Sequence, residues 1–223
     1  LTKKLNAAGG VVITASHNPA KYNGFKIKGD FGGPAHPEMI DKVEKELKKV
    51  LRSKTEQKKS FQELIGKELI QKRDFTEVYV DDVKSKLNIA LIQSSGLKIA
   101  YDAMYGAGQG VMEKIVPVKI ALRQALNPSF GGSHPEPLPQ HLKGLAAAVV
   151  EQGCDIGIAT DGDADRIGAF DEKGSFVDSH RIFALLLKYF IEQKGWTGEV
   201  AKSFSVSQII NKMCQKYQLV LHE

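Results

Sequence analysis

The sequence has few cysteines, no long hydrophobic run and no strong excess of one charge. Its two cysteines, Cys154 and Cys214, lack the spacing of a metal site and are too few for a disulfide framework, which favours a reducing, cytoplasmic location. Because no apolar run approaches the roughly 20 residues that cross a bilayer, we expect no membrane partner. The 31 basic and 26 acidic residues leave a net charge of +5 without a dense basic block, which argues against nucleic acid as a partner.

Strand-like and helix-like segments alternate along the 223 residues. Short apolar runs rich in β-branched residues, bounded by turn residues, predict strands over 11–14, 25–28, 97–102, 155–159, 167–170, 199–202 and 219–221. Apolar residues three to four apart predict helices over 37–51, 75–87, 111–115, 141–152, 179–194 and 207–217. This alternation predicts an α/β fold of consecutive α/β/α domains with mixed, largely parallel sheets. The polar, charged segment 52–60 is expected to be an exposed linker.

The motif TDGDADR, residues 160–166, carries the strongest chemical signal. Asp161, Asp163 and Asp165 crowd three carboxylates into one turn, and their mutual repulsion favours a bound cation. Ligands that are all oxygen select a hard divalent ion, and three side-chain ligands leave positions open for water or phosphate, which suits Mg²⁺.

Other readings of this motif remain open. The three aspartates and Glu172 fill positions one, three, five and twelve of an EF-hand loop, which would make the chain a non-catalytic calcium-binding module. However, Arg166 stands where that loop requires glycine, and the flanking residues predict strands where an EF-hand needs helices. A solvated acidic turn is a further possibility. A phosphate-ester hydrolase with Asp161 as nucleophile is another, although Asp165 stands where such an enzyme has threonine.

Ser16 follows the first predicted strand in the stretch TASHNP. A serine in such a turn can simply cap a helix or turn the chain. If it carries a phosphoryl group, its phosphate supplies a further oxygen ligand to a metal ion, which then assists phosphoryl transfer. Backbone N–H groups in such a turn can cradle a phosphate, and His17 or Lys26 could move protons or balance charge.

Three motifs in one order resemble the α-D-phosphohexomutase superfamily, in its phosphoglucomutase/phosphomannomutase branch. They are TASHNP with the NGFK that follows it, FGGSHPEP at 130–137, and DGDADR. The resemblance implies that Ser16 is the phosphoserine and that Asp161, Asp163 and Asp165 hold Mg²⁺ together with it. It also implies that Arg166 contacts the phosphoserine region, that His17 and Lys26 lie beside the phosphoryl group, and that Lys202 reaches the active site from a third domain.

By the same resemblance, the substrate is a phosphorylated hexose whose phosphate is exchanged between O1 and O6. The exchange passes through glucose 1,6-bisphosphate, or its mannose equivalent, as intermediate and activator. Glucosamine is less expected, because that branch usually carries DGDGDR where Ala164 stands here. The oligomeric state and the resting phosphorylation of Ser16 stay open.

The resemblance also divides the chain into the end of a first domain over 1–74, a second domain over 75–178 and the start of a third over 179–223. Because the family's sugar-recognition loop, its fourth-domain phosphate loop and its N-terminal strand have no counterpart here, we expect a partial chain that is inactive alone. The glycine-rich YGAGQG at 105–110 does not match the dinucleotide-binding pattern G-x-G-x-x-G, and no lysine-serine pair of a Walker motif follows it. We therefore interpret it as a structural turn.

Overall fold

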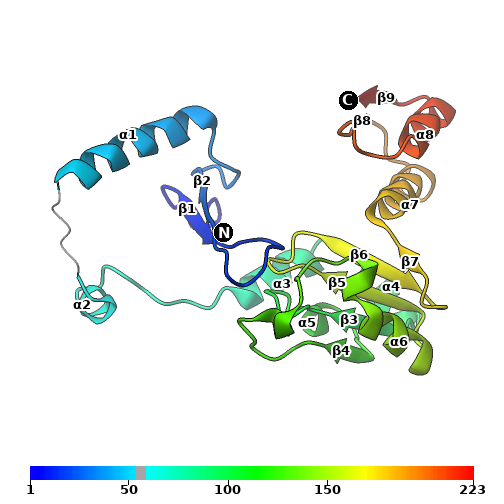
Figure 1. The fold of residues 1–223 in the computed structure, drawn as a ribbon. Helices are drawn as coiled ribbons and strands as arrows, with labels where there is room; N and C mark the ends of the chain where they lie inside the picture. The colour runs from blue at the N-terminus through cyan, green and yellow to red at the C-terminus, as the bar shows by residue number, and fades with distance from the viewer. Residues whose placement is uncertain (54–58) are drawn as a thin grey trace. The chain divides into compact units, whose positions relative to one another are not determined.

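The computed structural model describes residues 1–53 and 59–223, so residues 54–58 of the expected linker lie outside the described part (Figure 1). The described chain divides into two compact units, Leu1–Asn88 and Ile89–Glu223. In the parts that the structure describes, no helix combines the length and the apolar character that crossing a membrane requires.

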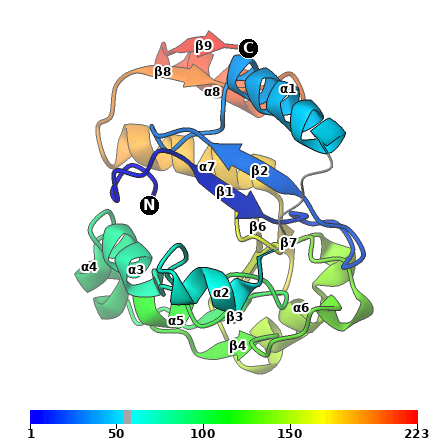
Figure 2. The ribbon, with the colours of Figure 1, turned by 90° about the vertical axis from the view of Figure 1, so that its left-hand side faces the viewer.

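In its described residues, the first unit contains a two-stranded antiparallel sheet and three helices (Figure 2). Strand β1 pairs with β2 in a register that runs from Gly10 opposite Lys28 to Ile13 opposite Phe25. The bounds are β1 Gly10–Ile13, β2 Phe25–Lys28, α1 Pro37–Ser53, α2 Phe61–Gly66 and α3 Thr76–Lys84. Helix α1 begins at Pro37, as its sequence predicts, because proline is well suited to the first turn of a helix. Ser60 caps α2 by accepting a hydrogen bond from the Glu63 N–H at 3.1 Å.

The second unit is built on a five-stranded sheet in the order β4-β3-β5-β6-β7 (Figure 1). Strand β3 is parallel to both β4 and β5, whereas β6 is antiparallel to both β5 and β7. The bounds are α4 Ile89–Ser94, β3 Ile99–Asp102, α5 Met112–Ile115, β4 Ile120–Leu122, η1 Phe130–Gly132, η2 Pro139–His141, α6 Lys143–Glu151, β5 Ile156–Thr160, β6 Ile167–Asp171 and β7 Phe176–Val177. The predicted mixed α/β fold is confirmed. Strands β5 and β6 are antiparallel because the short turn between them leaves no room for a parallel crossover.

Helix α6 forms the main core of the sheet with β3, β5 and β6. Leu142, Leu145 and Val149 are fully buried and belong to one cluster with residues of these strands. Burying side chains of this size stabilises the fold by about 1.5–3 kcal/mol each. The packing is close: a Cβ added to Gly157 of β5 would lie 2.6 Å from Val149 Cγ2.

The C-terminal part of the second unit has a core of its own. It comprises α7 Ser179–Glu192, β8 Glu199–Ala201, α8 Ile209–Tyr217 and β9 Val220–His222, with β8 parallel to β9. Ala184, Leu187, Val200, Ile210 and Cys214 form its buried cluster. Both cysteines are buried and free, so each serves as a small apolar core residue.

Candidate active site

The loops of the candidate site in the second unit follow strands that are parallel to one another. The chain leaves β3 at Asp102, β4 at Leu122 and β5 at Thr160, and these residues end strands whose carboxyl ends lie at one edge of the sheet. Ligand sites in open α/β sheets occur at this edge. The sheet therefore gathers the turn after β3 and the aspartate motif after β5 in one place.

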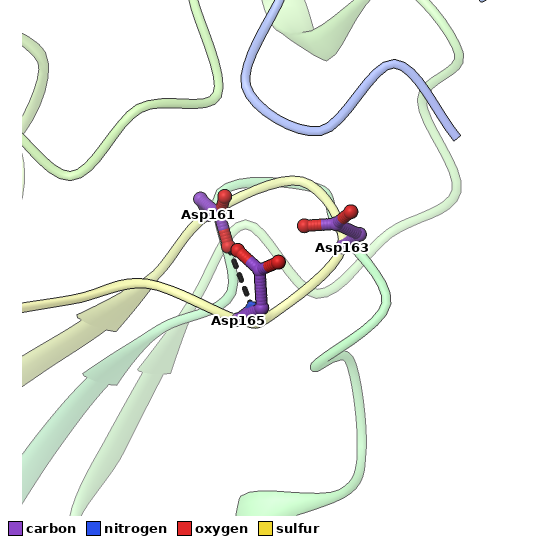
Figure 3. A group of neighbouring side chains, drawn as sticks. All are labelled: Asp161, Asp163 and Asp165. Carbon is purple, nitrogen blue, oxygen red and sulfur yellow. Dashed lines mark hydrogen bonds between the residues drawn. The ribbon is translucent and has the colours of Figure 1, made fainter. Parts of the chain in front are cut away.

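The three aspartates lie close together on a short loop between β5 and β6 (Figure 3). Asp161, Asp163 and Asp165 each offer one carboxylate oxygen, and these oxygens all lie within 4.8 Å of one another. The loop is closed by Asp161 Oδ1, which accepts hydrogen bonds from the backbone N–H of Asp165 at 2.9 Å and of Arg166 at 3.0 Å. Because the flanking elements are strands, the helix-loop-helix of an EF-hand is not formed here.

Asp161 is the buried member of the group. Its side chain is 0% exposed, and its second oxygen, Oδ2, has no hydrogen-bond partner among the described residues. Burial raises the pKa of this carboxyl group, the charges of Asp163 and Asp165 raise it further, and the two backbone N–H donors act in the opposite direction. An ionised carboxylate in this position is thus costly unless a cation balances it.

These residues fit a bound Mg²⁺. A buried carboxylate oxygen without a hydrogen-bond partner in the described chain, beside two further carboxylates, supplies the all-oxygen ligand set that this ion prefers. Arg166 brings a positive charge near that oxygen, with its Nε 4.0 Å from Asp161 Oδ2. Arg166 is also paired with Glu136 Oε1 at 3.3 Å, so its guanidinium lies at the rim of the loop.

The turn after β1 holds Ser16 in an uncommon backbone conformation. Its φ of +56° places a non-glycine residue in the left-handed region, which is a strained arrangement found often at functional sites. The Ser16 N–H donates to Thr14 Oγ1 at 2.8 Å, and Asn18 N–H donates to Ala15 O at 3.0 Å. His17 Nδ1 lies 3.4 Å from Ser16 Oγ, and the role of His17 beside a phosphoryl group stays a prediction.

The two predicted lysines lie on different elements. Lys26 is on β2, opposite Val12 of β1. Lys202 directly follows β8, and its side chain is 0% exposed, with Nζ 3.1 Å from Glu223 Oε1. The two groups form an ion pair, but the angles between them do not meet the requirements of a hydrogen bond. Ser16, His17 and Lys26 belong to the first unit and the other predicted residues to the second, so their meeting at one site stays a prediction.

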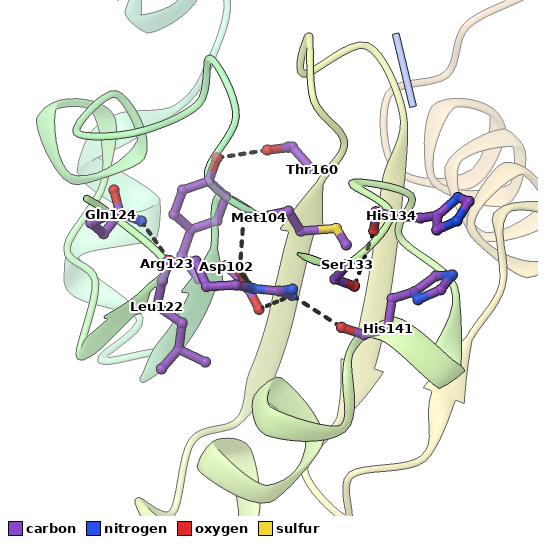
Figure 4. A network of polar contacts seen from close by, with 10 residues as sticks. Asp102, Met104, Leu122, Arg123, Gln124, Ser133, His134, His141 and Thr160 are labelled. Carbon is purple, nitrogen blue, oxygen red and sulfur yellow. Dashed lines mark hydrogen bonds and ion pairs between the residues drawn. The ribbon is translucent and has the colours of Figure 1, made fainter. Parts of the chain in front are cut away.

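Sequence reasoning overlooked a buried ion pair at the ends of two neighbouring strands (Figure 4). Asp102, at the end of β3, is paired with Arg123, which follows β4: Arg123 Nε donates to Oδ1 at 2.7 Å, and Nη2 to Oδ2 at 2.5 Å. Asp102 is 1% exposed. The available signal was an aspartate at the end of the buried run IAYD and an arginine directly after the run IAL.

Two family models match the chain, and together they cover more than half of it. The model described as phosphoglucomutase/phosphomannomutase, alpha/beta/alpha domain I, matches residues 1–54. The model for alpha/beta/alpha domain II of the same family matches residues 77–174. The second match includes the aspartate loop and the Asp102–Arg123 ion pair.

Curated relatives carry the names of several phosphomutases. The chain is 31% identical to a phosphoglucosamine mutase from Clostridium kluyveri over 229 residues, which covers 96% of this chain and 46% of the relative. It is 33% identical to a phosphopentomutase from Thermococcus kodakarensis over 219 residues, with the same coverage of each. The chain thus spans about half the length of the curated relatives it matches.

Solved structures share the fold. A crystal structure of a protein from Thermus thermophilus, provisionally named a phosphomannomutase, superposes with a TM-score of 0.80 and 27% identity. The match covers 99% of this chain and 49% of that protein. With both domain models in their order along the sequence, these similarities show that the chain belongs to the α-D-phosphohexomutase superfamily.

Proposed function

We propose that this chain carries the phosphoryl-transfer half of a phosphohexose mutase that interconverts hexose 1-phosphate and hexose 6-phosphate. The buried Asp161 Oδ2, which lacks a hydrogen-bond partner in the described chain and lies beside two further carboxylates, is the observation that carries the proposal. Glucose and mannose phosphates are the substrates that the sequence motifs favour, and the names of the relatives add glucosamine phosphate as a candidate.

In this proposal Ser16 Oγ carries the phosphoryl group. The group passes to a sugar hydroxyl as the bond between Oγ and phosphorus breaks, and a bisphosphorylated sugar such as glucose 1,6-bisphosphate results. The sugar hydroxyl must lose its proton and Ser16 Oγ must gain one as it leaves. His17, whose Nδ1 lies 3.4 Å from Ser16 Oγ, is a candidate for carrying this proton, together with Lys26. Lys202 and Arg166 are proposed to balance the phosphate charge.

Mg²⁺ is proposed as the metal, held by Asp161, Asp163 and Asp165 with the phosphate on Ser16 as a further oxygen ligand. When bound, the ion withdraws electron density from the phosphoryl group and so assists transfer. The chain's own part is to fix the three carboxylates. Two backbone N–H groups hold Asp161 Oδ1 and leave Oδ2 available to the ion.

The structure disfavours the hydrolase alternative. A nucleophilic Asp161 would need a free carboxylate oxygen, yet Oδ1 accepts from two backbone N–H groups and Oδ2 is the oxygen proposed to hold the ion. The calcium-module alternative loses its structural basis, because strands β5 and β6 flank the loop. Neither alternative gives Ser16 a role.

The test is intact-mass analysis with peptide mapping after the 223-residue chain is incubated with glucose 1,6-bisphosphate and Mg²⁺. We expect one added phosphate on the peptide that holds Ser16, and none in a Ser16→Ala variant. Ser203→Ala, which removes a serine of the second unit, is the matched control and should label like the wild type. Labelling that persists in Ser16→Ala would refute the assignment.

A further inference from the structure

Gly162, between the first two aspartates of the metal loop, is held from both sides by backbone hydrogen bonds. Its carbonyl accepts from the Ala107 N–H at 3.0 Å, and its own N–H donates to the Pro135 carbonyl at 3.1 Å. Ala107 lies in the turn after β3, and Pro135 lies in the SHPEP segment that precedes η2. Two loops distant in sequence therefore fix the position of the aspartate loop.

Gly106 makes the contact between the first of these loops and the aspartate loop especially tight. A Cβ added at Gly106 would lie 2.7 Å from the carbonyl oxygens of Asp161 and Gly162 and 2.9 Å from Gly162 Cα. All three atoms belong to backbone, so no side chain could rotate away to make room. Any side chain at position 106 must push the aspartate loop or its own turn out of place.

The Asp102–Arg123 ion pair joins the end of β3, where the turn that contains Gly106 begins, to the residue that follows β4 (Figure 4). Asp102 Oδ1 accepts from the Met104 N–H at 2.9 Å, at the start of the turn that contains Gly106. Arg123 Nη2 donates to the His141 carbonyl at 3.2 Å, at the end of η2, and the Arg123 carbonyl accepts from Tyr105 N–H at 3.1 Å. The pair thus holds the turn that contains Gly106 and the end of η2, the helix that follows the Pro135 segment.

We propose that Gly106 and the Asp102–Arg123 pair are positioning residues of the metal centre, which set the spacing of the three carboxylates through Gly162. The proposal rests on the proposed metal site, because it assigns these residues the task of preorganising that site. None of them is among the three proposed ligands. Residues that orient metal ligands in this way typically change metal affinity about 10- to 100-fold when altered.

The experiment measures Mn²⁺ binding to the 223-residue chain by electron paramagnetic resonance, with Mg²⁺ competition, for the wild type and Gly106→Ala. Gly144→Ala is the matched control, because a Cβ at Gly144 of α6 meets nothing within 4 Å. Asp163→Asn removes the charge of a proposed ligand and shows how much Mn²⁺ affinity is lost when the metal site itself is damaged. Thermal melting of each metal-free variant shows whether it is folded.

We expect Gly106→Ala to weaken Mn²⁺ binding about 10-fold or more while Gly144→Ala binds as the wild type does. Equal affinity of wild type and folded Gly106→Ala, with binding abolished in Asp163→Asn, would overturn this inference and leave the metal site intact. If Asp163→Asn binds as tightly as the wild type, the proposed metal site fails, and the inference with it. If Gly106→Ala fails to fold, Arg123→Lys takes its place, because lysine keeps the charge but cannot make the bidentate contact with Asp102. A folded Arg123→Lys that binds Mn²⁺ as tightly as the wild type would then overturn the inference.

Discussion

Replacing Arg123 by Met tests how much the buried ion pair contributes to the second unit. The side chains of Arg123 and Asp102 are 19% and 2% exposed, so the pair is largely removed from water. In the wild type, Asp102 accepts two hydrogen bonds from the guanidinium and one from the Met104 N–H. The substitution removes both guanidinium hydrogen bonds, so of these three donors to the buried Asp102 carboxylate only the Met104 N–H remains.

The expected loss of unfolding free energy is about 3–5 kcal/mol, the range for breaking a buried ion pair by removing one partner. Removing both charges should cost much less. In the double variant Asp102→Asn with Arg123→Met, the amide oxygen keeps the Met104 hydrogen bond and no charge remains buried. We expect this double variant to regain most of the loss.

Urea unfolding followed by circular dichroism measures these differences. Arg181→Met is the matched control, because it removes the exposed pair between Arg181 and Asp178, which lie 3.6 Å apart with 70% and 42% of the side chains exposed. Pairs of that kind contribute about 0–1 kcal/mol. A loss below about 1 kcal/mol for Arg123→Met would refute the reasoning, as would a double variant less stable than the single one.

Two further substitutions test the aspartate loop. Burial raises the pKa of Asp161 in the folded, metal-free protein. Between the pKa of the unfolded chain and this raised pKa, the folded protein holds a proton that the unfolded chain has lost. The contribution of Asp161 to the free energy of unfolding therefore falls as pH rises through this range. In EDTA, the melting temperature of Asp161→Asn minus that of wild type should therefore increase from about pH 4 to about pH 7, and a flat difference would contradict this. Ala164→Gly should raise the free energy of unfolding by at most roughly 1 kcal/mol, because Ala164 has a φ of +61° that glycine adopts without strain. A urea midpoint that falls clearly below that of wild type would contradict this.

The elements with strong local patterns were predictable from the sequence. The apolar stripe after Pro37 predicts helix α1, and the β-branched and apolar runs predict β1, β5 and β6 within a residue or two at each end. The aspartate motif was predictable for the same reason, since its residues are neighbours in sequence and one short turn brings them together.

Short or tertiary features were not predictable. The helices α2 and α4 have six residues each, and β4 and β7 have three and two, so their patterns are too short to stand out. The Asp102–Arg123 pair joins residues that are 21 positions apart and depends on β3 and β4 lying side by side. The tight approach of Gly106 to the aspartate loop likewise exists only once the sheet has formed.

The backbone conformation of Ala164 bears on the expectation that glucosamine is the less favoured sugar. It occupies the left-handed region in the middle of the aspartate loop, where its N–H donates to the Asp161 carbonyl at 3.1 Å. Glycine reaches this conformation without cost, so alanine and glycine can both form the same turn around the same carboxylates. The conformation of Ala164 therefore gives no physical reason to expect glucosamine less than glucose or mannose.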